Sequence, residues 1–223
     1  MTKTLTIGVD LNKVVADTLL GLHRVSCQVA NIQIPPLYFD GKNCVGQEFP
    51  SRSGSGQLTE FTQGHYEEAK RLYFEDRSGF ENNARPCAGA VRALQILRSH
   101  GHSMVLVSDV KGLPESFLER WWKLNKLPGD TDFVLTRGQV EKTEYYSICD
   151  VVIDNDAQHL LPLVGVADIQ LLHMLPAPES VGSMVVTRPS NLPKRIASVR
   201  GWDEALAKMG IDTSKSADLD QAA

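Results

Sequence analysis

Near its N-terminus the chain carries the stretch TLTIGVDLNKVVAD at residues 4–17. An apolar, β-prone run ends at Asp10, and Asn12 follows two residues later. Such an apolar run is typical of a strand that is buried on both faces of a parallel sheet. In open α/β sheets the ligand crevice lies at the carboxyl ends of the strands, so a carboxylate there favours a chemical role. Asp10 is therefore the first candidate site residue.

Strand and helix patterns alternate from about residue 86 onward. Buried-strand patterns occur at residues 103–108, 133–136, 151–154 and 168–173, with a weaker one at 184–187. Helical patterns occur at residues 86–101, 115–124, 142–149 and 201–207. This alternation predicts an α/β fold, with a Rossmann-like parallel sheet and right-handed crossovers.

Residues 17–83 interrupt this alternation. Helical patterns at residues 19–32 and 60–75 enclose a loop-like stretch, and no buried-strand pattern appears between them. We expect a small, mainly helical cap inserted between the first strand and the rest of the core. The predicted domains are a core of residues 1–16 and 84–211, the cap of residues 17–83, and a flexible tail of residues 212–223.

The composition excludes several classes of protein. The 223 residues carry a formal net charge of -4 with scattered basic residues, which argues against duplex nucleic acid as a ligand. No apolar run approaches the roughly 20 residues that a membrane span needs. Four well-separated cysteines without a CxxC pair, and the absence of a signal-peptide pattern, predict a cytoplasmic protein with reduced thiols. A homodimer is compatible with the sequence.

Carboxylates follow two of the predicted strands. Asp10 ends the first strand and is followed by Asn12, while Asp154 ends a later one and is followed by Asp156. If these strands are adjacent, the carboxylates repel one another unless a cation lies between them. A hard divalent ion with oxygen ligands fits best, so the sequence predicts Mg2+ at this edge of the sheet.

Phosphate-binding groups accompany these carboxylates. Ser108 and Asp109 end another strand pattern, and Lys142 lies ahead of the strand that ends at Asp154. A serine at a strand end can donate to a phosphate oxygen, and a lysine can neutralise a phosphate group. Each residue alone is more often a cap or a solvated side chain, but their order along the chain is specific.

The ordered set resembles the haloacid dehalogenase-like (HAD) superfamily. The four motifs of that family match Asp10-Leu11-Asn12, Val107-Ser108, Lys142 and Asp154-Asn155-Asp156, in this order. Within the superfamily the chain is most similar to the 5'(3')-deoxyribonucleotidase branch, through residues 14–17, 85–90, 135–137, 152–156 and 201–204. The resemblance spans about residues 4–207.

The resemblance implies a Mg2+-dependent phosphohydrolase that acts on a small phosphate monoester, such as a nucleoside 5'-monophosphate. Asp10 would be the nucleophile and would form an aspartyl-phosphate. Ser108 and Lys142, with Asp109 nearby, would hold the transferring group. The ligands of Mg2+ would be Asp10, the backbone carbonyl of Asn12, Asp154 and, in support, Asp156.

Asn12 departs from the family pattern. Phosphatases of the family have a second aspartate there, which protonates the leaving oxygen and later activates water. An amide can do neither, and losing such acid–base help costs about 10²–10⁴ in rate. One alternative is therefore a HAD-fold pseudoenzyme, a phosphate- or nucleotide-binding protein with little turnover. Another is an enzyme whose leaving group needs no proton. Lys13 likewise replaces the glycine that is usual in the branch.

Overall fold

The computed structural model describes residues 3–39, 41–54, 56–108, 114–136, 139–175 and 191–213. Its centre is a parallel six-stranded sheet in the order β5-β4-β1-β6-β7-β8. The strands are β1 (Thr6–Asp10), β4 (Ser103–Ser108), β5 (Asp132–Leu135), β6 (Val151–Asp154), β7 (Gln170–Met174) and β8 (Ile196–Val199). This is the Rossmann strand order, in which the chain turns back at β1, so the predicted α/β fold is confirmed.

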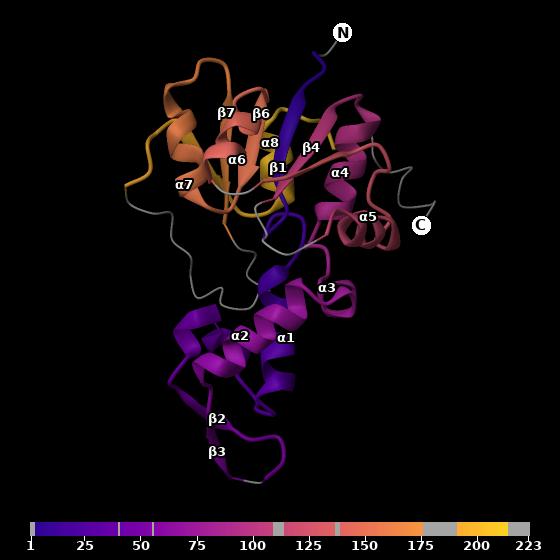
Figure 1. Ribbon diagram of the computed structural model, residues 1–223. Helices are drawn as coiled ribbons and strands as arrows, with labels where there is room; N and C mark the ends of the chain where they lie inside the picture. The colour runs from indigo at the N-terminus through magenta and orange to yellow at the C-terminus, as the bar shows by residue number, and fades with distance from the viewer. Residues whose placement is uncertain are drawn as a thin grey trace.

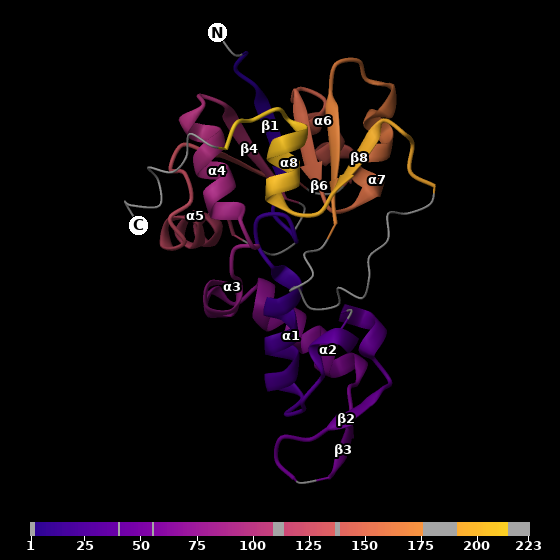
Figure 2. The ribbon, with the colours of Figure 1, turned by 180° about the vertical axis from the view of Figure 1, so that it is seen from behind.

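Helices cover both faces of the sheet. Helices α6 and α7 lie on one face, and α4, α5 and α8 lie on the other (Figures 1 and 2). Their bounds are α4 (Ala90–Ser99), α5 (Glu115–Leu124), α6 (Gln139–Tyr146), α7 (Ala157–Leu160) and α8 (Trp202–Lys208), and a 3-10 turn at Leu161–Gly165 follows α7. Two separate clusters of buried apolar side chains result, one on each face.

Strand β1 shows how the sequence builds both layers. Ile7 and Val9 are almost fully buried in the larger apolar cluster. On the opposite face, a Cβ atom on Gly8 would lie 2.9 Å from the Cys149 sulfur and 3.0 Å from the Tyr146 ring. Glycine at position 8 therefore lets α6 pack directly against β1. This close packing brings the side chains of α6 beneath the carboxyl end of the strand.

The segment predicted as a cap lies beyond the carboxyl ends of the central strands (Figure 1). It contains α1 (Thr18–Val29), α2 (Gln63–Phe74), α3 (Arg77–Asn83), β2 (Glu48–Pro50), β3 (Leu58–Glu60) and 3-10 turns at Pro36–Tyr38 and Gly41–Cys44. The antiparallel pair β2–β3 was not expected, because three-residue strands are too short to give an alternating pattern. The helices dominate this segment, as the sequence predicted.

Other element predictions shift by a few residues. The pattern at 168–173 forms β7 from Gln170, because Asp168 turns the chain with a φ of 63°. The helix predicted at 142–149 begins at Gln139 and ends at Tyr146. Strand β8 was missed, and the weak pattern at 184–187 lies outside the described residues. Within the described part of the chain, no helix is both long and apolar enough to cross a bilayer.

Two passages of the chain run side by side where the cap segment joins the core. The Asp17 N–H donates to the Arg85 carbonyl at 2.7 Å, and the Cys87 N–H donates to the Val15 carbonyl at 2.8 Å. Trp121 Nε1 donates to the nearby Ala84 carbonyl at 3.0 Å. These hydrogen bonds fix both connections at the edge of the sheet where β1 ends. The predicted domain boundaries themselves stay a prediction.

Candidate active site

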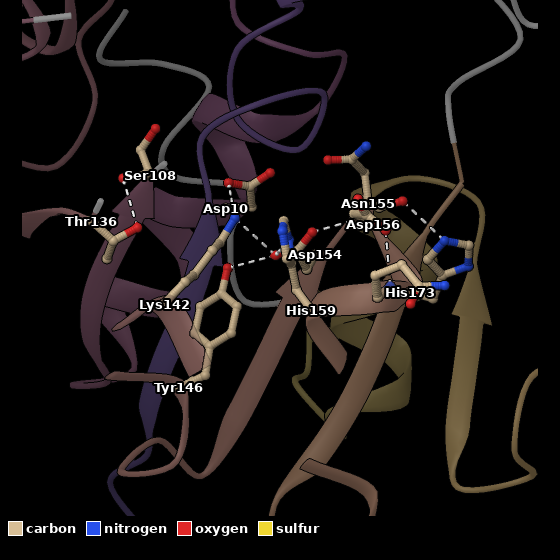
Figure 3. A network of polar contacts seen from close by, with 11 residues as sticks. Asp10, Ser108, Thr136, Lys142, Tyr146, Asp154, Asn155, Asp156, His159 and His173 are labelled. Carbon is tan, nitrogen blue, oxygen red and sulfur yellow. Dashed lines mark hydrogen bonds and ion pairs between the residues drawn. The ribbon is translucent and has the colours of Figure 1, made fainter. Parts of the chain in front are cut away.

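The predicted site residues meet at the carboxyl ends of three neighbouring strands. Asp10 ends β1, Ser108 ends β4 on one side of it, and Asp154 ends β6 on the other. From α6, Lys142 Nζ reaches between the carboxylates, 2.7 Å from Asp10 Oδ1 and 3.1 Å from Asp154 Oδ2 (Figure 3). The Lys142 side chain is fully buried, as is that of Asp154. A buried cation thus separates two buried carboxylates.

Protein donors surround the carboxylate of Asp154. Besides Lys142, Oδ2 accepts from Tyr146 OH at 2.8 Å and from His159 Nδ1 at 3.0 Å (Figure 3). Oδ1 accepts from the Asp156 N–H at 2.7 Å. Three of these four donors converge on Oδ2 and one on Oδ1, so both oxygens of the carboxylate are engaged. Asp154 therefore holds the side chains of Lys142, Tyr146 and His159 in place.

These contacts change the acidity of the groups involved. Burial alone would raise the pKa of Asp154, but the hydrogen bond from His159 and the charge of Lys142 hold it below its ordinary value. Burial alone would lower the pKa of His159, but the hydrogen bond to Asp154 and its charge raise it. Burial, with the charges of Asp154 and Asp10, raises the pKa of Tyr146 well above its ordinary value. Tyr146 thus remains a protonated donor.

Two oxygen atoms converge on the side chain of Asn155. An amide atom of Asn155 lies 2.8 Å from the Asn12 carbonyl oxygen and 3.0 Å from Asp10 Oδ2. Both neighbours are acceptors, so the amide donates to both only in the orientation that turns its nitrogen toward them. The backbone carbonyl of Asn155 accepts a hydrogen bond from His173 Nε2 of β7 at 3.0 Å (Figure 3).

The donor set at this point suits the predicted cation. Mg2+ prefers carboxylate, carbonyl and water oxygens and usually retains several waters. Asp10 Oδ2 and the Asn12 carbonyl supply such oxygens at one common position. Among the described residues, no group of three or more His, Cys, Asp or Glu side chains is arranged to hold a metal. Asp10 Oδ2 and the Asn12 carbonyl would therefore contact the ion at this position, and the contribution of Asp154 and Asp156 stays a prediction.

The loop after β1 holds Asn12 in place. The N–H groups of Val15 and Ala16 both donate to the Leu11 carbonyl, and Trp202 Nε1 donates to the Val14 carbonyl at 2.9 Å. Lys13 has a φ of 57°, in the left-handed region that favours glycine. Glycine would adopt this conformation without steric cost.

The side chain of Asn12 has a different environment from its backbone carbonyl. Its side-chain oxygen Oδ1 is buried and has no hydrogen-bond partner among the described residues. A buried acceptor without a donor costs about 1–3 kcal/mol. The side-chain oxygen at the position predicted for the acid thus has no donor among the described residues.

The structure describes two of the three remaining predicted site residues. Ser108 is fully buried, and its carbonyl accepts from the Thr136 N–H at 2.8 Å and from Thr136 Oγ1 at 3.3 Å. Asp156 is exposed and caps α7 by accepting from the Gln158 N–H at 2.9 Å. Asp109 lies outside the described residues.

A cavity of about 460 Å³ opens above the site. Its core side is lined by Asp10, Asn12, Lys13, Asn155, Asp156 and His159. The opposite side comes from the cap segment and is formed by Thr18, Leu19, Leu22, Lys42, Tyr66, Lys70 and Phe74. The cavity therefore combines a polar floor with a wall of apolar, aromatic and cationic side chains.

Sequence reasoning missed three residues at the centre of the site. Tyr146 lies four positions after Lys142, so the helical period already placed both on one face of α6. His159 lies five positions after Asp154, but its hydrogen bond depends on how α7 turns back. Asn155 was quoted only as part of a motif, and no pattern showed its direction.

No protein-family model matches the chain, and a search of curated proteins finds no match. Solved structures do match over nearly the whole length. A HAD family hydrolase from Deinococcus radiodurans R1, with bound phosphate and sodium, has 14% identity and a TM-score of 0.59, covering 94% of this chain and 98% of its own.

Two further structures agree. A haloacid dehalogenase-like family hydrolase from Streptococcus pneumoniae has 13% identity and a TM-score of 0.53, covering 94% of this chain and 100% of its own. A predicted phosphatase from Clostridium acetobutylicum has 15% identity and a TM-score of 0.55, covering 93% and 99%. At such identities the likeness concerns the fold, and this chain has the α/β fold of HAD-family hydrolases.

Proposed function

We propose that the protein is a Mg2+-dependent phosphohydrolase that cleaves a small phosphate monoester with Asp10 as the nucleophile. One observation carries the proposal: the buried Lys142 Nζ bridges Asp10 and Asp154, at 2.7 and 3.1 Å, and Asp10 lines the cavity. The lysine offsets the negative charge of Asp10 and of the second carboxylate beside it, and it can attract an approaching phosphate. The fold shared with HAD-family hydrolases supports the same chemistry.

The proposed reaction has two displacements at phosphorus. An Asp10 oxygen attacks the phosphorus atom, the bond to the ester oxygen breaks, and an aspartyl-phosphate forms. Water then attacks this phosphorus, which releases inorganic phosphate and regenerates the Asp10 carboxylate. Lys142 and Ser108 stabilise the charge on the transferring group. Mg2+, when bound at Asp10 and the Asn12 carbonyl, would offset the repulsion between nucleophile and phosphate.

Proton transfer to the leaving group is the step for which this site is least well equipped. The departing ester oxygen needs a proton, and the Asn12 amide has none to give near neutral pH. We therefore propose that turnover is slow for alkyl phosphates and faster for esters whose leaving group is a weak base.

The cap wall also suggests the kind of leaving group. Tyr66 and Phe74 offer aromatic faces, and Lys42 and Lys70 add positive charge on the same side of the cavity. Lys70 Nζ lies 5.1 Å from the centre of the Tyr66 ring. A planar, polar group beside the phosphate would suit this wall. Nucleoside 5'-monophosphates are therefore the first substrates that we propose to test for binding and turnover, although as alkyl phosphates they should be cleaved slowly.

The direct test is a panel of phosphate monoesters assayed for phosphate release with Mg2+. We expect release from at least one member and its loss in Asp10→Asn. The matched control is Asp17→Asn, because Asp17 caps α1 by accepting from the Leu20 N–H, and asparagine caps equally well. Absence of release from every member, or activity that survives in Asp10→Asn, would contradict the proposal.

A second function is favoured by the unsatisfied Asn12 amide. A protein that keeps the phosphate and cation sites without the acid would bind a phosphate or nucleotide and release no product. Calorimetry with inorganic phosphate and with nucleoside monophosphates would detect such binding in the wild-type protein. Binding together with measurable turnover would rule out this purely binding role.

A further inference from the structure

The cap side of the cavity carries positive charge. Lys42 and Lys70 line that side, together with apolar and aromatic side chains. Among the described residues that line the cavity, the carboxylates are Asp10 and Asp156, and both belong to the core side. A substrate group that faces the cap side therefore meets two ammonium groups and no carboxylate of the described residues.

One glutamate lies close to both lysines. Lys70 Nζ lies 2.9 Å from Glu67 Oε2. The hydrogen bond from Lys70 is the main cause that lowers the pKa of Glu67, and the charge of Lys42 lowers it further. Glu67 is not among the residues that line the cavity, and one carboxylate offsets only one of the two charges. A net positive charge thus remains on the cap side.

A neutral leaving group would suit this charge poorly. Its contact would remove water from the ammonium groups and supply no counter-charge, and burying an unpaired charge is costly. The nucleoside that is released from a 5'-monophosphate is such a neutral group. An anionic leaving group would instead accept charge-assisted hydrogen bonds from Lys42 and Lys70, which are stronger than neutral ones. The cap side therefore favours a leaving group that carries negative charge of its own.

The missing acid at position 12 favours the same kind of group. The Asn12 amide cannot protonate a departing oxygen. An alkoxide is about as strong a base as hydroxide, whose conjugate acid, water, has a pKa of about 15.7, so it departs poorly without a proton. A phosphate group has its last pKa at about 6, so it departs as a stable anion at neutral pH. Two independent features of the cavity thus agree on an anionic, weakly basic leaving group.

We propose that the preferred substrate is a phosphoric anhydride, whose leaving group is a second phosphate group held by Lys42 and Lys70. A nucleoside diphosphate would also place a planar base beside Tyr66 and Phe74 of the same wall. Inorganic pyrophosphate is the other source of this bond. The inference rests on the proposed function, because Asp10 remains the nucleophile, and it specifies which bond to phosphorus breaks most readily.

The anhydride removes the need for an acid in the first step. An Asp10 oxygen attacks the terminal phosphorus, and the bond from that phosphorus to the bridging oxygen breaks. The electron pair stays on the bridging oxygen, which becomes a terminal oxygen of the departing phosphate group. Water then attacks the aspartyl-phosphate, and the Asp10 carboxylate departs with the electron pair of its bond to phosphorus. One proton of this water passes to the phosphate group that was released in the first step.

The test compares adenosine 5'-diphosphate with adenosine 5'-monophosphate, each assayed for phosphate release with Mg2+. The two compounds share a nucleoside and differ in the bond that is cleaved. We expect kcat/KM to be at least about 100-fold higher for the diphosphate, because only the monophosphate needs the missing acid. Asp10→Asn should abolish both activities. Inorganic pyrophosphate is the third substrate: cleavage of it supports the anhydride, and its rate relative to the diphosphate identifies the source.

Two variants test the two arguments separately. Asn12→Asp should accelerate release from the monophosphate about 10²-fold or more and from the diphosphate much less, so the preference narrows. Asn82→Asp is its control, because Asn82 is exposed in α3 and the substitution adds the same charge away from the site. Lys70→Ala should raise the KM for the diphosphate at least about tenfold, and more than the KM for the monophosphate. Arg71→Ala should change neither, because Arg71 does not line the cavity.

Failure of the inference can be told apart from failure of the proposed function. Cleavage of the monophosphate as efficiently as the diphosphate would overturn the inference and leave the proposed function in place. Cleavage of the diphosphate while no monoester is cleaved would support the inference and overturn the proposed monoesterase. Diphosphate cleavage that survives in Asp10→Asn, or a preference that neither Asn12→Asp nor Lys70→Ala changes, would also overturn the inference. Release from no substrate at all would overturn both.

Discussion

Lys142 Nζ lies 2.7 Å from Asp10 Oδ1, although the two residues are 132 positions apart in the chain. The contact exists because α6 packs closely on β1 across Gly8. Lys142 also touches Asp154, so one buried cation serves two buried carboxylates. Removing a single member of such a group leaves uncompensated buried charge. This buried charged group therefore contributes to the stability of the sheet at the carboxyl ends of its strands.

Lys142→Met should destabilise the protein and remove phosphatase activity. The methionine fills similar space but leaves Asp10 and Asp154 facing one another without the lysine. We expect a loss of about 3–5 kcal/mol in the free energy of unfolding, measured with urea at pH 7. Lys123→Met is the control, since Lys123 is exposed on α5 and should change stability by no more than about 0.5 kcal/mol. Equal stability of both variants would contradict this account of the buried group.

Asn12→Asp should increase the rate of phosphate release. The new carboxyl group would replace the amide whose oxygen, Asn12 Oδ1, is now buried without a hydrogen-bond partner among the described residues. It could give a proton to the leaving oxygen and take one from water, which is worth about 10²-fold or more. The measurement is kcat/KM on the best monoester, with Asn82→Asp as the charge-matched control. An unchanged rate would mean that a missing acid is not what limits this site.

The strand-end residues were predictable because buried apolar runs point to them. Asp10, Ser108 and Asp154 each end such a run, and adjacent parallel strands must bring their carboxyl ends to one edge. Lys142 was placed by its order in the chain, and only the packing of α6 shows that it bridges two carboxylates. The sequence thus contained the candidates for the floor of the site, while their contacts came from tertiary packing.

The parts that could not be predicted depend on side-chain direction. His159 and Asn155 lie in short connections after β6, where no periodic pattern specifies which way a side chain points. The hairpin β2–β3 escaped prediction for a related reason, because its short strands are mostly exposed. Period-based reasoning needs several residues in one conformation, and these segments do not supply them.

Asp150 should stabilise the start of the sheet in a pH-dependent way. Its carboxylate accepts from Lys3 Nζ at 2.6 Å and from the Thr6 N–H at 2.8 Å. These hydrogen bonds, first that of Lys3 and then that of Thr6, hold the pKa of Asp150 below its ordinary value of 3.8. The contribution is therefore present above pH 3.8 and is lost as the pH falls through the lower folded-state pKa.

We expect Asp150→Asn to reduce the free energy of unfolding by about 0.5–1 kcal/mol at pH 7, since one of its two donors is exposed. The difference from wild type should vanish in acid, which urea unfolding at a series of pH values would measure. Lys3→Ala should lower stability by less than Asp150→Asn, because Lys3 is largely exposed and the hydrogen bond from the Thr6 N–H remains. A difference that persists unchanged below the folded-state pKa would contradict a charge-based role.

Lys70 and Arg71 offer a matched pair for testing the cap wall. They are neighbours on α2, and each pairs with a glutamate three positions earlier, Lys70 with Glu67 at 2.9 Å and Arg71 with Glu68 at 2.8 Å. Only Lys70 of the two lines the cavity. Lys70→Ala should therefore raise KM about threefold to tenfold for nucleoside monophosphates and leave kcat nearly unchanged. Arg71→Ala should change neither. Equal effects of both variants would show that general charge on α2, and not contact with substrate, is responsible.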